Sequence, residues 1–231
     1  MKTHAFVFAR GGSKGVPKKN LLSIGGIPLL AHSIRTAQRI TEVEGVFVST
    51  DDTEIAETAR NYGAEIITRP PELAQDDSPE WLAWQHAVSW VIRYHGEFSR
   101  FVSIPTTAPL RSDEDVLACL EALTPDWDLV MTMTPSARSP WFNIVTEESG
   151  GKLRLVANPY DRIIRRQDAP STYDLTTVAY TAWTAHILGS KSIWSGKVRG
   201  VKVPLERALD IDTEYDFQIA KCLLGRRNAT D

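Results

Sequence analysis

Arg10 opens a short segment rich in glycine and positive charge, Arg-Gly-Gly-Ser-Lys-Gly-Val-Pro-Lys-Lys-Asn, which ends at Asn20. The glycines allow tight turns and let backbone N–H groups approach an anion closely. The four cations supply charge, and Ser13 and Asn20 can form hydrogen bonds with phosphate, ribose or base. The alternative is a solvated basic turn, but the composition favours a cradle for a triphosphate.

Two common phosphate-binding loops do not match this segment. A Walker loop needs Lys and then Ser or Thr after its last glycine, whereas Val16 follows Gly15. A dinucleotide-binding loop needs Gly-x-Gly-x-x-Gly, and the adjacent glycines 11 and 12 break that spacing. The segment is therefore an anion-binding loop of another kind.

A pair of carboxylates lies far along the chain, in Leu209-Asp210-Ile211-Asp212. In an extended segment alternate side chains share a face, so Asp210 and Asp212 would lie together. Mg²⁺ prefers one or two carboxylates combined with phosphate oxygens and water. The spacing supports a second interpretation equally well, in which Asp212 and Thr213 cap a final helix. Asp212 can serve both purposes.

The bulk composition narrows the classes of protein. A chain of 231 residues can form one α/β domain with a sizeable core. The net charge of −3 gives no general attraction to nucleic acid. No apolar run is long enough for a membrane span, and the short apolar run before Arg10 predicts a buried strand, not a signal peptide. Cys119 and Cys222 are expected to be reduced core residues, which indicates a cytoplasmic protein.

Strand-like and helix-like patterns alternate along most of the chain. Strands are expected at 5–9, 46–48, 66–67, 101–104, 129–133, 178–183 and 201–203. Helices are expected at 27–40, 51–62, 80–94, 112–124 and 213–224, with Asp51 and Ser112 as N-caps and Gly63 and Gly225 as stops. The alternation predicts a three-layer α/β fold with a doubly wound, mostly parallel, Rossmann-like sheet and ligands at the carboxyl ends of its strands. From about 135 to 173 the pattern breaks down, which predicts an excursion from a single domain spanning 1–231.

The residues from Phe8 to Asn20 closely resemble the signature of the sialic-acid cytidylyltransferases, the CMP-acylneuraminate synthetases and their relatives. Agreement continues in the expected order over nearly the whole chain, in Val48-Ser-Thr-Asp51, Arg69-Pro-Pro-Glu-Leu-Ala-Gln-Asp76, Pro105-Thr-Thr-Ala-Pro-Leu-Arg111, Arg165-Arg-Gln167 and Leu209-Asp-Ile-Asp-Thr-Glu-Tyr-Asp216. The resemblance implies a nucleotide-diphosphosugar-transferase fold, a homodimer, and Mg²⁺-dependent transfer of CMP from CTP to a sialic-acid-like nonulosonic acid.

The resemblance also implies roles in an in-line attack by the sugar's anomeric hydroxyl on the α-phosphorus of CTP. Arg10 and Lys19 would stabilise charge on the α-phosphate and the pyrophosphate, and Asp210 and Asp212 would hold the metal. The implied nucleotide contacts are Gly11, Gly12, Ser13, Lys14, Asn20, Arg69 and Asp76. No residue stands out as a general base, and a metal-bound hydroxyl needs no dedicated one.

The sugar-acid contacts implied by the resemblance are Thr106, Thr107, Thr176 and Tyr180. Arg166 and Gln167 would approach the sugar acid from the partner subunit, and the alternative for that pair is a solvated basic loop.

Two departures from the N-acetylneuraminate enzymes concern the sugar. Pro105 stands where those enzymes have Gln, and Thr176-Thr177 stands where they have Asn-Gly. These changes predict a nonulosonate with fewer hydroxyls, of the legionaminate or pseudaminate kind. The alternatives are a cytidylyltransferase for another acid, an ulosonate or a phosphonate, and a non-catalytic nucleotide-binding protein of the same fold.

Overall fold

The computed structural model describes residues 1–12, 15–157 and 165–227. A seven-stranded sheet forms its centre, in the order β11 (Val198–Lys202), β7 (Leu129–Pro135), β10 (Tyr173–Trp183), β6 (Arg100–Ser103), β1 (Thr3–Phe8), β4 (Gly45–Thr50) and β5 (Glu65–Thr68). β10 runs antiparallel to its neighbours β6 and β7, and the other pairs in this sheet are parallel. The predicted mostly parallel sheet is confirmed.

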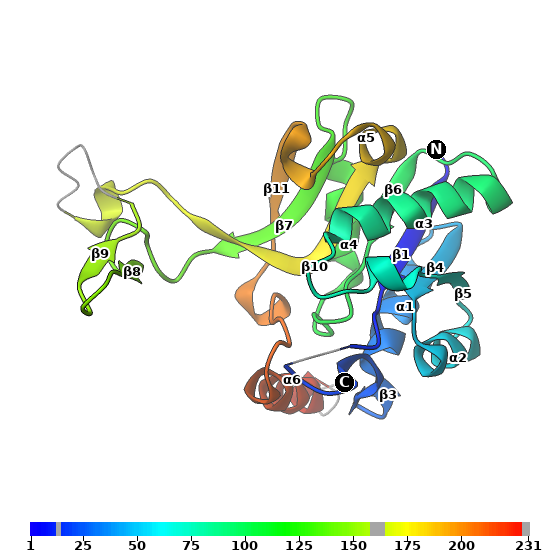
Figure 1. The fold of residues 1–231 in the computed structure, drawn as a ribbon, viewed down its shortest axis with the longest axis horizontal. Helices are drawn as coiled ribbons and strands as arrows, with labels where there is room; N and C mark the ends of the chain where they lie inside the picture. Colours follow the sequence, from blue (N-terminus) through cyan, green and yellow to red (C-terminus); the bar gives the residue numbers. More distant parts are fainter. Residues whose placement is uncertain (13–14, 158–164, 228–231) are drawn as a thin grey trace.

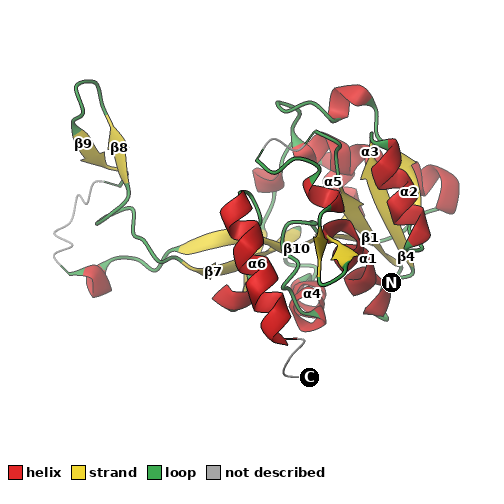
Figure 2. Ribbon diagram, turned by 90° about the horizontal axis from the view of Figure 1, so that it is seen from below, coloured by secondary structure: helices red, strands yellow, loops and turns green. Residues whose placement is uncertain are grey.

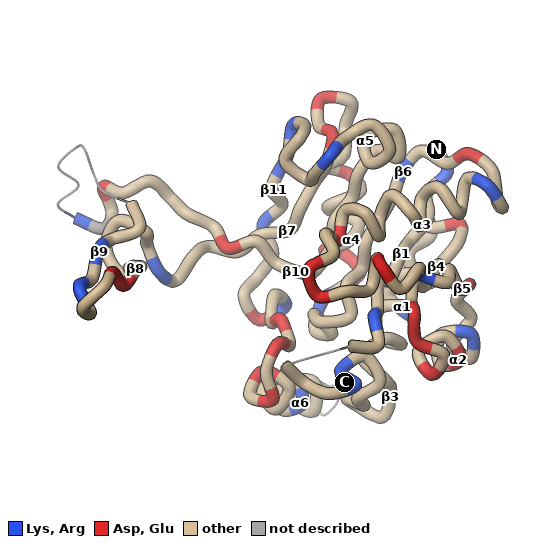
Figure 3. Tube along the Cα trace, in the orientation of Figure 1, with Lys and Arg blue, Asp and Glu red and all other residues tan. Residues whose placement is uncertain are grey.

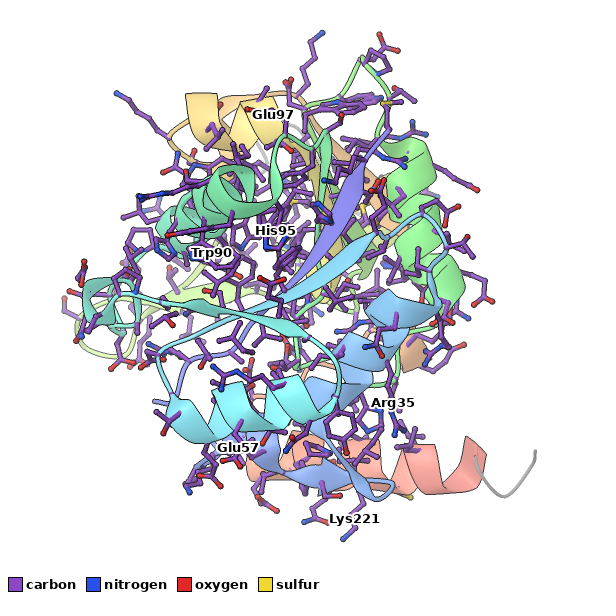
Figure 4. All side chains as sticks on the ribbon, turned by 90° about the vertical axis from the view of Figure 1, so that its right-hand side faces the viewer. Arg35, Glu57, Trp90, His95, Glu97 and Lys221 are labelled. Carbon is purple, nitrogen blue, oxygen red and sulfur yellow. The ribbon has the colours of Figure 1, made fainter. Side chains whose placement is uncertain are left out.

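Helices cover both faces of this sheet, which gives the predicted three layers (Figure 1). α3 (Glu80–His95) and α5 (Thr184–Gly189) pack together on one face. α1 (Leu29–Arg39), α2 (Thr53–Asn61) and α4 (Asp113–Ala122) cover the other. Figure 4 looks onto an edge of the sheet, with Trp90 and His95 of α3 on one side of the strands and Arg35 of α1 and Glu57 of α2 on the other.

The first strand shows why the sequence folds in this way. Its apolar residues are buried on both faces of the sheet, as expected for a central parallel strand. Phe6 packs into the cluster beneath α3, whereas Ala5 and Val7 pack toward the helices on the opposite face. A strand of this kind needs both helical layers, so β1 holds the following loop at a fixed place.

Helix ends agree with the sequence in two cases and differ in two. α2 ends just before Gly63, whose positive φ of 81° suits the predicted stop. Ser112 begins α4 in a capping box with Asp115, as predicted. The N-cap of α2 is Asp52, not the expected Asp51, because Asp52 Oδ1 accepts from the N–H groups of Glu54 and Ile55 at 2.8 and 2.9 Å. The last helix, α6 (Glu214–Arg227), runs through Gly225 and does not stop there. Glycine costs a helix about 1 kcal/mol but keeps its N–H, so it does not by itself end one.

Smaller elements join these layers. β2 (Ser23–Ile24) pairs with β3 (Ile27–Pro28), and β8 (Val145–Glu147) pairs with β9 (Leu153–Leu155). Short 3₁₀ turns cover Lys19–Leu21, Pro71–Leu73, Arg166–Asp168, Ile193–Ser195 and Leu205–Arg207. Both cysteines are free thiols; Cys119 is buried as predicted, whereas the prediction that Cys222 is a core residue is wrong, because its side chain is exposed. In the described ranges no helix combines the length and apolar character needed to cross a membrane.

Residues 136–157 and 165–172 lie outside the sheet and are called the arm here. β7 and β10 lead into it as a paired ribbon, with Tyr173 opposite Pro135, and the β8–β9 hairpin lies beyond (Figure 1). Figure 2, from below, shows the arm projecting from the rest of the molecule. The arm carries exposed apolar side chains, which are Ile144, Val145, Leu153 and Val156. Figure 3 shows both signs of charge spread over the chain, with several basic positions on the arm.

Candidate active site

The loops that follow four parallel strands meet at one edge of the sheet. The segment after β1 begins near Arg10, Asp51 follows β4, Arg69 follows β5 and Thr106 lies just beyond β6. Carboxyl ends of parallel strands are where α/β sheets bind ligands. Two cavities open here and share a wall.

The first cavity, called the basic cavity here, has a volume of about 260 Å³ and is lined in part by Arg10, Arg69 and Asp76. The Arg10 guanidinium lies 2.9 Å from the Asp76 carboxylate, so the two side chains close one side of the cavity. Three residues expected to contact the nucleotide therefore lie together, although they come from separate loops.

Arg69 is held rigidly at the base of this cavity. Its guanidinium donates to the hydroxyl and the carbonyl oxygen of Ser49 at 3.1 and 2.8 Å, and lies over the Phe8 ring at 5.6 Å. Burial lowers the pKa of Arg69 from its ordinary value, while the Asp51 and Glu80 carboxylates oppose that shift. Arg69 thus presents a fixed positive charge to the cavity.

The second cavity, called the acidic cavity here, has a volume of about 230 Å³. Its walls bring together distant parts of the sequence, and the residues that line it are Phe8, Glu80, Pro105, Thr106, Thr107, Thr177, Tyr180, Asp210 and Asp212. Both carboxylates of the late acidic pair therefore face one space, as the extended-chain prediction requires. A backbone bond from Ile211 N–H to the Thr107 carbonyl, at 2.8 Å, holds the pair beside the loop after β6.

The glycine-rich loop contacts this acidic segment through its backbone. Gly15 lies so close to the Asp212 carbonyl oxygen that a side chain there would collide with it. Gly11 lies against Asp52, and its N–H donates to Asp51 Oδ1 at 3.1 Å. Gly12 faces open space. Ser13 and Lys14 lie outside the described residues.

Lys19 joins the loop to the acidic pair. Its ammonium donates to the Ile211 carbonyl at 2.6 Å and lies 3.2 Å from Asp212 Oδ1. The Lys19 side chain is 14% exposed, whereas that of Asp212 is 72% exposed. Lys19 is therefore buried against the backbone with its charge directed at the acidic cavity.

Asn20 has a structural position in this arrangement. Its amide donates to the Arg10 carbonyl at 3.1 Å, and its oxygen accepts from the Thr106 hydroxyl at 2.7 Å. Asn20 is buried and lines neither cavity. Asn20 thus lies behind the loop, where its two hydrogen bonds hold Arg10 and Thr106 in place.

The helix-cap interpretation of Asp212 does not agree with the structure. Asp216 Oδ2 accepts from the Thr213 N–H and hydroxyl at 2.8 and 2.7 Å, and the Thr213 hydroxyl accepts from Asp216 N–H at 3.2 Å. Thr213 and Asp216 therefore cap α6 between them. The Asp212 side chain remains directed at Lys19.

The chemistry of the acidic pair fits a cation. Burial raises the pKa of Asp210, the neighbouring Asp212 carboxylate raises it further, and the hydroxyls of Thr107 and Thr177 oppose the shift. Asp210 Oδ1 is buried and has no hydrogen-bond partner among the described residues. In the same described residues no group of three or more His, Cys, Asp or Glu side chains is placed to hold a metal. Two carboxylates completed by phosphate and water are the donor set that Mg²⁺ takes.

Thr177, and not Thr176, faces the acidic cavity. The Thr176 hydroxyl points into the sheet and donates to the Thr132 hydroxyl at 2.7 Å. Thr177 contacts the Thr107 hydroxyl at 3.1 Å. Adjacent residues of a strand point to opposite faces, so the two threonines cannot both line one pocket. Thr106, Thr107 and Tyr180, also expected at the sugar acid, do line it.

Gln167 lies on the arm and lines a separate cavity of about 270 Å³ between the two ends of the arm, with Pro135 and Tyr173. None of the residues that line the acidic cavity comes from the arm of the same chain. Arg166 is in the same 3₁₀ turn, but its side chain lies outside the described structure.

Two residues at the shared wall of the cavities carry no role in the sequence prediction. Phe8 and Glu80 line both cavities. Glu80 follows a proline and reads as an ordinary acidic residue in a first helical turn. The signal that could identify it is its place just after the Arg69–Asp76 segment.

The chain is an α/β protein with two adjoining cavities at the carboxyl ends of its parallel strands, and comparisons with known proteins identify its family. A CMP:2-keto-3-deoxy-manno-octonic acid synthetase complexed with CTP has the same fold, with a TM-score of 0.72 at 17% identity, over 98% of this chain and 100% of that one. The family model described as cytidylyltransferase matches residues 4–103.

Two relatives match nearly the full length. The CMP-N,N'-diacetyllegionaminic acid synthase of Campylobacter jejuni is 32% identical over 96% of this chain and 94% of its own. The post-translational flagellin modification protein B of Campylobacter coli is 30% identical over the same shares, 96% and 94%. The chain belongs to the sialic-acid-type cytidylyltransferase family, and so to the nucleotidyltransferases.

Proposed function

We propose that this protein transfers CMP from CTP to the anomeric hydroxyl of a nonulosonic acid and releases pyrophosphate. The observation that carries the proposal is the meeting of two adjoining cavities beneath one anion-binding loop. The basic cavity has the cationic and acidic side chains suited to a nucleotide, and the acidic cavity has hydroxyls suited to a sugar. The loop runs from the one to the other, from Arg10 to Lys19.

In the proposed reaction the anomeric oxygen forms a bond to the α-phosphorus as the bond from that phosphorus to pyrophosphate breaks. Arg10 lies where negative charge on the transferring phosphate increases, and Lys19 neutralises charge from the opposite side of the loop. Preorganised cations of this kind stabilise developing charge without reorganising during the reaction. Positioning and neutralisation are the main requirements of phosphoryl-type transfer.

The proposal includes Mg²⁺ held by Asp210 and Asp212. When bound there, the ion supplies charge neutralisation to phosphate oxygens beside the acceptor. The orphaned Asp210 oxygen and the exposed Asp212 carboxylate support this assignment. Lys19 then also fixes the backbone of the segment that carries both ligands.

We further propose a homodimer in which the arm reaches the partner's acidic cavity with Gln167 and Arg166. Support comes from the exposed apolar side chains of the arm, which a dimer interface would remove from water. The legionaminate class is the acceptor we infer, since a 32% identical relative carries that name and Pro105 lines the acidic cavity without a side-chain donor. Two free thiols support a reducing, cytoplasmic setting.

The test is pyrophosphate release by the purified protein with CTP, Mg²⁺ and a panel of sugar acids. We expect release with nonulosonates and none with an eight-carbon ulosonate. Calorimetric titration should show tighter binding of CTP than of UTP. Binding of CTP without turnover of any acid would instead identify a non-catalytic nucleotide-binding protein, and equal affinity for UTP would contradict the nucleotide assignment.

A further inference from the structure

Glu80 lies at the boundary between the two cavities. Only Phe8 and Glu80, among the described residues, line both of them, and Phe8 carries no polar side-chain atom. Under the proposed function the nucleotide and the acceptor occupy adjoining cavities, so the new bond forms at their boundary. Glu80 is therefore the ionisable side chain at that boundary.

The Glu80 carboxylate is held in a defined orientation. One turn further along α3, the indole N–H of Trp84 donates to Glu80 Oε1 at 3.2 Å. Trp84 is itself fully buried, packed between Phe101 and Tyr180 with ring centroids 4.9 and 5.7 Å away. The carboxylate thus rests on an immobile donor, while its outer surface stays open to the cleft.

The surroundings of Glu80 favour its neutral form more than water does. Glu80 is an exposed residue, but the protein packed around its carboxyl desolvates it in part, and this raises its pKa. The Trp84 hydrogen bond and the Arg69 charge act in the opposite direction. The other titratable groups that face the shared space are Tyr180, whose own pKa is raised by burial and then by Glu80, and Arg10, Asp76, Asp210 and Asp212.

A purely structural role would also place an acid here. An acidic residue in the first turn interacts favourably with the helix dipole. That role accounts for a carboxylate at the start of α3. It does not require the carboxylate to face both cavities or to rest on a buried indole.

We propose that Glu80 is the general base of the reaction. The carboxylate accepts the proton of the anomeric hydroxyl as its oxygen bonds to the α-phosphorus, and pyrophosphate leaves with the electrons of the broken bond. The protonated Glu80 then returns its proton to water after the products depart. A base positioned in this way contributes about 10²–10⁴-fold to a rate. The proposal rests on the proposed function, because it assigns a group to that same transfer.

The experiment is single-turnover CMP transfer by the full chain at saturating CTP and sugar acid, over a range of pH. We expect Glu80→Gln to slow the transfer step by about 10²-fold or more while the Kd for CTP stays within about twofold. The wild-type transfer rate should fall at low pH as Glu80 is protonated. The transfer rate of Glu80→Gln should not show this decrease. Glu80→Asp, which keeps a carboxylate, should give an intermediate transfer rate that still falls at low pH.

Glu72→Gln is the matched control, because Glu72 is exposed on a nearby 3₁₀ turn and lines neither cavity. Its rate should match wild type. Full activity in Glu80→Gln, or a weaker CTP affinity with an unchanged transfer step, would overturn the inference and leave the proposed function intact. A folded wild-type protein that releases no pyrophosphate with any acid would overturn both.

Discussion

Lys19 and Asp212 stand 193 residues apart in the sequence and form an ion pair of 3.2 Å between Nζ and Oδ1. The same ammonium donates a hydrogen bond to the Ile211 carbonyl oxygen at 2.6 Å. The glycine-rich loop and the acidic pair are therefore directly connected, so a substitution in one should also affect the other.

Asp212→Asn should lower kcat at least ~10²-fold, because a charged ligand is lost where phosphate charge develops. Glu214→Gln is the matched control, since Glu214 is an exposed acidic residue in the first turn of α6 and lines neither cavity. That variant should keep its kcat and change the unfolding free energy by less than ~0.5 kcal/mol. Steady-state kinetics in Mg²⁺ with urea denaturation measures both effects. Near wild-type turnover in Asp212→Asn would contradict the metal assignment.

Gly15→Ala should destabilise the loop, because the new methyl group collides with the Asp212 carbonyl oxygen. Overpacking of this kind costs about 1–3 kcal/mol, and displacement of Asp212 should also reduce activity. Gly12→Ala, with open space around its Cβ position, should change the unfolding free energy by less than ~0.5 kcal/mol. Equal stability of the two variants would show that the loop does not press on the acidic segment.

Alanine substitutions at the two adjacent threonines of β10 should have different effects, one on substrate binding and the other on stability. Thr177→Ala should raise KM for the sugar acid by up to ~10-fold without lowering Tm, because Thr177 lines the acidic cavity. Thr176→Ala should lose about 1–2 kcal/mol of stability with KM unchanged, because the buried Thr132 hydroxyl loses a partner. The opposite pattern would mean that β10 is registered differently against β7.

Leu153→Lys should weaken or abolish the proposed dimer. Leu153 is 63% exposed on the arm hairpin, and a charge there would be desolvated in an interface. Trp194 is 66% exposed but lies outside the arm, so Trp194→Lys should leave the association unchanged. Light scattering measures the mass of each variant, and the monomeric form should lose activity. A fully active monomer would contradict the assignment of the arm.

Stability should fall as the pH decreases from about 6.5 to 4, through His4. Burial, with Lys2 and His95, lowers the pKa of His4 to about 4, and among the described residues neither ring nitrogen has a hydrogen-bond partner. The unfolded chain binds this proton near pH 6.5, so acid favours the unfolded state by up to roughly 3 kcal/mol. His4→Leu should flatten urea-derived stability over that range. An unchanged slope would place the effect on other groups.

Most of the layered fold could be predicted from the sequence, because a strand buried on both faces has a strong local signature. The continuous apolar run around Phe6 shows this clearly. The reversal of β10 could not be predicted, since strand direction depends on the path of the whole chain and not on local periodicity. The arm hairpin was missed for a related reason, because β8 and β9 are short and exposed on every side.

The grouping of Arg10, Arg69 and Asp76 around one cavity could be anticipated, because each follows a strand of the predicted parallel sheet. Thr176 was misplaced because β10 has an irregular register against β7 between Leu175 and Tyr180, which the sequence does not reveal. The position of Glu80 could not be predicted, because the two cavities that it lines form only in the folded chain.

The contact of Lys19 with Ile211 also constrains how the protein is made. The glycine-rich loop leaves the ribosome early, but the Ile211 carbonyl that accepts from Lys19 emerges 192 residues later. The central strands can pair before then, so a nascent chain acquires its sheet first and its closed loop last. Until that segment emerges, Gly15 has no Asp212 carbonyl to pack against, and Lys19 has no Asp212 carboxylate to pair with. Incomplete chains should therefore carry a formed core without a competent site.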